Sequence, residues 1–130
     1  MARNDSATPV TKNAADMMVE RLNATGVPFV RDAWENKAPD DYGVLEVIGQ
    51  SGALWGDDRM LAQVIQLRIH LYVNGSRDDL VTTVQNLLND VCYTYSLPSH
   101  EFLFDIAKNH WTWDCHIIGP LQWDEVAADG

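Results

Sequence analysis

One run of residues, 61–73, alternates apolar and polar side chains. The apolar members are Leu61, Ile65, Leu67, Ile69, Leu71 and Val73, with Gln63 the exception, and the intervening ones include Gln66, Arg68, His70 and Tyr72. A period of two predicts a strand with one buried and one solvated face. At about 3.3 Å per residue this strand spans about 43 Å, whereas typical strands have about 5–6 residues. A small domain does not easily cover such a strand, so we expect part of it to bend, to project as an arm or to pair with a neighbouring subunit.

Two other segments carry apolar residues at helical spacing. The first covers residues 13–25, and its C-terminal end is clearly marked, because Gly26 suits a left-handed cap and Pro28 cannot continue the helix. The second follows the long strand, with Ser76 expected as its N-cap. Its apolar stripe consists of Leu80, Val84, Leu87, Leu88 and Val91. Both segments are therefore predicted to be amphipathic helices.

Four further runs predict strands, at residues 27–34, 42–49, 101–107 and 110–118. Residues 50–59 are expected to connect the second of these to the long strand, and they are too many for a tight turn. Lys108 and Asn109 are expected to form a two-residue turn before the last strand. In the run before that turn, the apolar residues Phe102, Phe104 and Ile106 alternate with polar ones.

The resulting order is helix, strand, strand, long strand, helix, strand, strand. It predicts an α+β fold in which two helices pack on one face of a mainly antiparallel sheet of about five strands. The other face, which carries Arg68 and His116, is expected to be solvated or buried against another subunit. We expect a single domain over residues 13–118, a flexible N-terminus at 1–12 and an acidic tail at 119–130.

Composition narrows the classes of function. The 130 residues are 46% apolar, which fits one compact domain, and no stretch approaches the roughly 20 apolar residues of a membrane helix. The polar N-terminus lacks the apolar block of a secretion signal, so synthesis in the cytoplasm is expected. The net charge is −10, and residues 78–130 carry nine acids against Lys108 alone, which argues against sequence-independent binding of nucleic acid. Cys92 and Cys115 are expected to be free and buried.

The last strand carries the residues best suited to chemistry. The candidates are His110, Asp114, Cys115 and His116, with Cys92 and His100 elsewhere in the chain. The two histidines and the aspartate would share one strand face, a spacing that can present ligands to a metal, but a solvated polar face is the ordinary explanation. The cysteine points the other way, between tryptophans, where desolvation leaves a thiol inert. With no phosphate-binding loop or nucleophile motif in the sequence, we expect no catalytic residue, no cofactor and no metal.

Two loops hold further candidates. Adjacent aspartates at 40–41 and 57–58 are able to bind a cation, although such pairs are more often simply solvated. Trp111 and Trp113 share a strand face and are expected in the core. Trp55 lies in a glycine-flanked loop and Trp123 in the acidic tail. Tryptophan at such positions is favoured as an interface anchor, and the alternative is that each folds back onto its own domain.

The chain resembles the tail terminator (tail completion) proteins of long-tailed bacteriophages. The resemblance covers residues 13–118. It is carried by the sequence of residues 42–60, YGVLEVIGQSGALWGDDRM, by residues 66–73 with the Asn-Gly-Ser break after them, and by the helix expected at 79–88. The resemblance implies a structural virion protein, not an enzyme. Such a protein forms a ring, usually of six subunits, on the end of the tail tube.

The resemblance also implies partners and a place. One face of the ring would meet the tail tube protein and the other the head–tail connector, at the head-proximal end of the tail, with DNA passing through the lumen without specific binding. No ring contact transfers by motif, so Trp55, Asp57 and Asp58 are named only as a candidate interface loop. The alternatives are a head-closure protein or another minor tail component, and a small metal- or ligand-binding domain that uses the strand face of His110 and His116.

Overall fold

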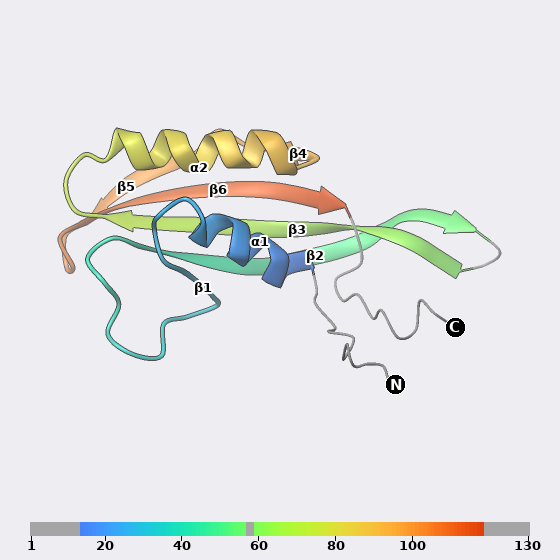
Figure 1. Ribbon diagram of the computed structural model, residues 1–130, viewed down its shortest axis with the longest axis horizontal. Coiled ribbons are helices and arrows are strands. Elements are labelled where there is room, and N and C mark those ends of the chain that lie inside the picture. Colours follow the sequence, from blue (N-terminus) through green and yellow to red (C-terminus); the bar gives the residue numbers. More distant parts are fainter. Residues whose placement is uncertain (1–13, 57–58, 119–130) are drawn as a thin grey trace.

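The computed structural model describes residues 14–56 and 59–118. Its elements, in chain order, are α1 (Ala14–Asn23), β1 (Phe29–Arg31), β2 (Tyr42–Gly56), β3 (Arg59–Val73), α2 (Asp78–Val91), β4 (Thr94–Tyr95), β5 (Ser99–Leu103) and β6 (Lys108–Ile118). The sheet runs β1-β2-β3-β6, and both β4 and β5 pair with the outer edge of β6 (Figure 1). β1 runs parallel to β2, and the other described pairings are antiparallel. The predicted α+β class is confirmed, with six strands in place of about five.

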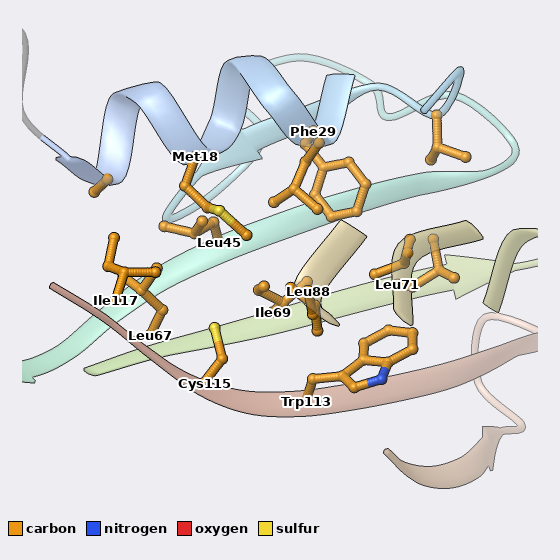
Figure 2. Close-up of a cluster of buried hydrophobic side chains, with 14 of the residues drawn as sticks. Met18, Phe29, Leu45, Leu67, Ile69, Leu71, Leu88, Trp113, Cys115 and Ile117 are labelled. Atoms are coloured by element: carbon orange, nitrogen blue, oxygen red, sulfur yellow. The ribbon is translucent and has the colours of Figure 1, made fainter. Parts of the chain in front are cut away.

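The alternating pattern of β3 places its odd residues in the core. Ile65, Leu67, Ile69, Leu71 and Val73 are all fully buried. They meet apolar side chains from both helices and from neighbouring strands, namely Met18, Leu22, Val84, Leu88, Leu45, Trp113 and Cys115 (Figure 2). Because α1 and α2 share this one cluster, both helices cover the same face of the sheet, as the sequence predicts.

The β2–β3 hairpin is longer than the rest of the sheet. Its two strands pair from Tyr42 and Tyr72 to Gly56 and Arg59, but β6 reaches along β3 only as far as Val64. Residues 51–56 and 59–63, which we call the arm, therefore continue as a two-stranded ribbon past the end of β6 (Figure 1). Of the three outcomes expected for the long strand, a projecting arm is the one observed.

The expectation of a long connecting segment at residues 50–59 was wrong. Residues 50–56 are part of β2, and β3 resumes at Arg59. Register shifts between Val47 and Gly49 and around Leu54 let a glycine-containing segment stay paired along β3. Strand formation here is decided by the partner strand, since this segment has little alternation of its own.

The first helix ends as expected, but the second begins differently. Gly26 has φ +101°, in the left-handed region that glycine favours. The Asn23 side chain joins this end to β1, since its Oδ1 accepts from the Phe29 N–H at 2.7 Å and its Nδ2 donates to the Phe29 carbonyl at 3.2 Å. Ser76 is not the N-cap of α2. Arg77 occupies that position, without a side-chain cap.

The terminal hairpin also differs from the prediction. The turn comprises residues 104–107, while Lys108 and Asn109 already belong to β6. Lys108 Nζ donates to the Asn74 side chain at 3.0 Å, and Asn109 Nδ2 donates to the Gly75 carbonyl at 2.8 Å. These contacts with the loop after β3 hold both residues in the strand, so the turn forms before them.

Some of the sequence-based expectations concern residues that the structure does not describe. The flexible N-terminus at 1–12, the acidic tail at 119–130 and Trp123 lie outside the described residues. In the part of the chain that is described, neither helix has the length and apolar character needed to cross a bilayer.

Candidate functional site

Of the three predicted interface residues, only Trp55 has a described backbone, and it lies near the end of the arm. The backbone of Trp55 is in β2, opposite Met60, and its side chain is outside the described part of the structure. Asp57 and Asp58 lie outside the described residues altogether. The assignment of Trp55, Asp57 and Asp58 to an interface therefore stays a prediction.

The sheet face turned away from both helices, which we call the bare face, carries a connected polar network. Its residues come from four adjacent strands and include Glu46, Arg68, His70, Tyr72, Glu101, His110, Thr112 and Asp114. On β2, β3 and β6 their placement follows from period two, because they alternate with residues of the helix-covered face. Glu101 is brought to this face by the pairing of β5 with β6. Register then decides which of them meet.

Two histidines form the centre of the network. His70 Nε2 donates to Glu46 Oε1 at 2.5 Å, and His70 Nδ1 lies 2.8 Å from His110 Nε2. His110 Nδ1 in turn lies 3.5 Å from Glu101 Oε1. The chain of contacts Glu46–His70–His110–Glu101 therefore crosses β2, β3, β6 and β5 in a single line. Both imidazoles are about 15% exposed, so water competes little for these contacts.

The donors and acceptors of this line can be counted. An ionised carboxylate only accepts, so each terminal link needs an N–H on the ring nitrogen that faces it. The central link between the two rings needs a third N–H. Two neutral imidazoles carry two, so all three hydrogen bonds form together only when the pair holds one additional proton. Burial lowers the pKa of His110, with the nearby His70 acting in the same direction, while Glu101 opposes the shift.

The rings of this face also stack across the strands. Tyr42 and Tyr72 lie 4.8 Å apart between centroids, and Tyr72 and His110 lie 4.4 Å apart with nearly parallel planes. Trp34 meets Tyr42 edge-on at 6.0 Å. Burial raises the pKa of both tyrosines. The stacked rings thus form a ladder across β2, β3 and β6.

A shallow cleft of about 360 Å³ opens beside the ladder. Its lining includes Asp32, Trp34, Tyr42, Glu46 and His70. Both ring nitrogens of His70 already have partners within the sheet, so this ring presents no free nitrogen to the cleft. The cleft can hold a small molecule or a side chain, but its histidine is not arranged to take a proton from an occupant.

The residues singled out on the last strand are brought into separate contacts. Asp114 accepts from Arg68 Nε at 2.8 Å, and His116 Nδ1 lies 3.0 Å from the Thr94 hydroxyl, whereas His110 joins the line described above. His100 is instead stacked on Trp111, with centroids 4.2 Å apart. Among residues 14–56 and 59–118, no three His, Cys, Asp or Glu side chains are grouped so as to hold a metal ion.

The two cysteines are free, as expected, but only Cys115 is fully buried. Cys92 is half-buried at the end of α2, which corrects the expectation for that residue. Hydrogen bonding with Cys92 and burial together raise the pKa of Cys115, so its thiol stays protonated and unreactive.

The aspartate pair at 40–41 serves structural contacts. Asp41 accepts from Arg77 Nη1 at 2.6 Å and from the Asn74 N–H at 3.0 Å, which ties the loop before β2 to the start of α2. The backbone carbonyl of Asp40 accepts from Lys108 Nζ. An acid held by a guanidinium and an amide is a poor candidate for a cation ligand. The second pair, at 57–58, is outside the described residues.

Sequence reasoning missed the two carboxylates that end the histidine line. Glu46 lies 24 residues before His70, and Glu101 lies nine residues before His110, and each meets its histidine through strand pairing. The sequence did hold one signal, since all four residues occupy the polar positions of the alternating pattern in their strands. This alternation alone does not show which strands are neighbours in the sheet.

Comparison with known proteins finds no family model that matches the chain and no match among curated proteins.

Proposed function

We propose that the protein is a tail terminator of a long-tailed bacteriophage. In this proposal it assembles as a ring of six copies on the end of the tail tube, stops tube polymerisation and joins the tail to the head. The observation that carries the proposal is the arm, residues 51–56 and 59–63. It extends past the end of β6, the strand that pairs with the rest of β3.

The arm is better suited to an assembly than to a lone subunit. An isolated two-stranded ribbon is marginally stable in water, because its backbone groups face solvent on both outer edges. Within the described residues β1 pairs with β2 only as far as Leu45, so the outer edge of β2 is open from Glu46 into the arm. An edge strand of a neighbouring copy is able to complete the ribbon. A contact between two different surfaces of the same chain generates rings when the rotation closes.

Charge and resemblance support the same role. The net charge of −10 suits a channel wall that DNA passes without being held. The similarity to tail terminators runs over residues 13–118, which includes both strands of the arm. The partners in this proposal are the tail tube protein and the head–tail connector, and the place of action is the head-proximal end of the tail, after synthesis in the bacterial host.

The native mass tests the ring. A species of roughly 88 kDa, six times the 14.6 kDa of one chain, is expected from native mass spectrometry or light scattering. A monomer at every concentration would require the ring to form only on the tube end. Purified tail tubes would then be added, and a failure to bind their ends would contradict the proposal.

A shortened arm gives the sharper test. Replacing residues 52–63 by Asn-Gly joins Ser51 to Val64, which are direct partners, through a two-residue turn. The hairpin would then end level with β6. We expect the circular dichroism of the folded body to persist while ring formation and tube binding are lost. The single change Trp55→Ala should also weaken assembly, whereas a loss of folding would place Trp55 in the core.

A head-closure protein or another minor tail component is the neighbouring alternative, since the arm serves any ring-shaped assembly. Binding to tube ends as opposed to capsid connectors separates the two roles. The cleft of about 360 Å³ favours a small-ligand domain as the candidate of a different class. A stoichiometric small molecule in carefully purified protein, lost on replacing His70, which lines the cleft, would support that candidate.

A further inference from the structure

The turn between β5 and β6 exposes large apolar side chains. Phe104 is 87% exposed, Ile106 45% and Phe102 42%. The rings of Phe102 and Phe104 meet edge to face with centroids 4.9 Å apart, so they form an ordered cluster instead of loose side chains. We call these three residues the turn knob. Scattered single apolar residues are ordinary on a surface, but an ordered group on a hairpin turn is typical of a contact site.

A concave surface with both apolar and charged lining residues lies elsewhere on the same chain. Its volume is about 340 Å³, and its lining comes from α1, the end of α2 and the end of β6. We call it the α1–α2 pocket, and its apolar lining includes Met17, Met18, Val91, Ile117 and Ile118. The volume falls in the range of pockets that bury small molecules, about 300–1,000 Å³, so an aromatic side chain fits within it.

The turn knob and the α1–α2 pocket of one chain cannot meet. The knob ends two residues before the start of β6 at Lys108, whereas the pocket includes the last two residues of β6, Ile117 and Ile118. β6 has 11 residues, which at about 3.3 Å each separates the two ends by about 33 Å. Figure 1 shows the β5–β6 turn at one end of the sheet and the end of β6 at the other. A knob and a pocket at opposite ends are arranged for a head-to-tail contact between copies.

Charges on both surfaces fit one orientation of such a contact. Asp105 lies within the turn, between Phe104 and Ile106, and is exposed. Arg21 lines the pocket from the α1 side and Asp90 from the α2 side. Insertion that brings Asp105 to Arg21 and keeps it away from Asp90 is favoured, whereas the reversed insertion places two carboxylates together. The charges thus select a direction, although exposed pairs contribute little free energy.

We propose that the turn knob of one copy inserts into the α1–α2 pocket of the next copy, with Asp105 beside Arg21. This inference rests on the ring assembly of the proposed function and names a contact within it. Two phenylalanines bury about 150–250 Å² each, less than the roughly 800 Å² per partner of a standard interface. The contact therefore acts together with the arm, and it supplies register and direction to the ring.

Cysteine pairing tests the contact directly. Phe104→Cys protein is mixed with Met17→Cys protein under oxidised glutathione, and the disulfide-linked dimer is measured on a non-reducing gel. Both proteins also carry Cys92→Ser, because the native Cys92 is free, half-buried and adjacent to the pocket residue Val91. We expect a dimer of twice the 14.6 kDa chain mass from the mixture and little from either variant alone. Thr82→Cys, on the exposed surface of α2, replaces Met17→Cys in the matched control and should give no dimer with Phe104→Cys. Phe104 is largely exposed, so its replacement leaves the core intact.

A charge exchange adds a second readout. In the cysteine pair, Arg21→Glu should reduce the dimer yield several-fold, and Asp105→Arg in the other partner should restore it. Absence of the dimer while the native mass shows a ring would overturn this inference and leave the proposed function standing. Dimer formation by Phe104→Cys alone would also overturn it, since the knob would then face another knob. A head-to-tail dimer from a protein that never binds tube ends would support the contact and remove the terminator role.

Discussion

The two faces of the sheet are built from the same strands and behave differently. On the helix-covered face, Leu67 and Ile69 of β3 and Trp113 of β6 are fully buried. On the bare face, the alternate residues Arg68 and His70 are partly exposed and take hydrogen-bond partners from neighbouring strands. The first face is held by removal of apolar surface from water, and the second by directional contacts. The comparison teaches that one alternating sequence supplies both a source of stability and a polar surface whose pairing depends on register.

The largest effect is expected on the covered face, at Trp113. Trp113→Ala should lower the free energy of unfolding by about 3–5 kcal/mol, through lost burial and the cavity left behind. Its indole Nε1 is buried without a partner among the described atoms, so Trp113→Phe should cost much less. Urea denaturation of both variants measures the difference. Equal losses for the two would show that the indole N–H has a partner after all.

The next effect tests how closely the covered face is packed. A Cβ added at Gly43 would lie 2.0 Å from Cε2 of Phe29, which pairs with it across β1 and β2. Gly43→Ala should therefore cost about 1–3 kcal/mol through displacement of the ring. The double variant with Phe29→Leu should recover part of this loss in the same denaturation assay. No recovery would mean that the backbone, and not the ring, resists the change.

A smaller effect is expected on the bare face and depends on pH. The pKa of His110 is lower in the folded protein than in the unfolded chain, because burial disfavours its charged form. The unfolded state therefore binds the proton first, and stability should be complete above about pH 6.5 and fall as the pH drops through the folded pKa. Groups facing His110 are His70, Tyr72, Thr112 and Glu101.

The urea midpoint between pH 5 and pH 8 measures this slope. His110→Gln should flatten it, whereas His100→Gln, whose histidine lies outside the line, is the matched control and should not. A slope that is unchanged in His110→Gln would assign the acid sensitivity to another group on the bare face.

The smallest effect is expected for the exposed pair Arg68 and Asp114. Their contact of 2.8 Å is open to solvent on both sides, so screening and side-chain entropy offset most of the attraction. Arg68→Gln should leave the thermal midpoint within experimental error. A clear decrease in the thermal midpoint that persists in about 0.5–1 M salt would show that the ion pair is shielded from solvent. The bare face would then be covered in solution, for example by another copy.

Much of the architecture follows from short-range patterns in the sequence. The alternation in residues 61–73 predicted the buried set of β3, and the stripe at Val84 and Leu88 predicted the inner side of α2, both of which the structure confirms. Errors fall where a distant partner decides the outcome. The segment at 50–56 extends β2 because β3 lies beside it, and the last turn forms at 104–107 because contacts with Asn74 and Gly75 retain Lys108 and Asn109 in β6.

The candidate sites show the same division. His110 was recognised as a polar residue of the last strand, but its partner His70 comes from β3, 40 residues earlier. Phe104 belonged to an apolar alternation that predicts burial, yet the chain turns there and leaves the ring exposed. The periodicity of side chains was determined by the sequence alone, because it is a property of the local backbone. The pairing of the histidines, the reach of the arm and the exposure of the turn knob were decided only by tertiary structure, because each depends on the register between segments that meet when the chain folds.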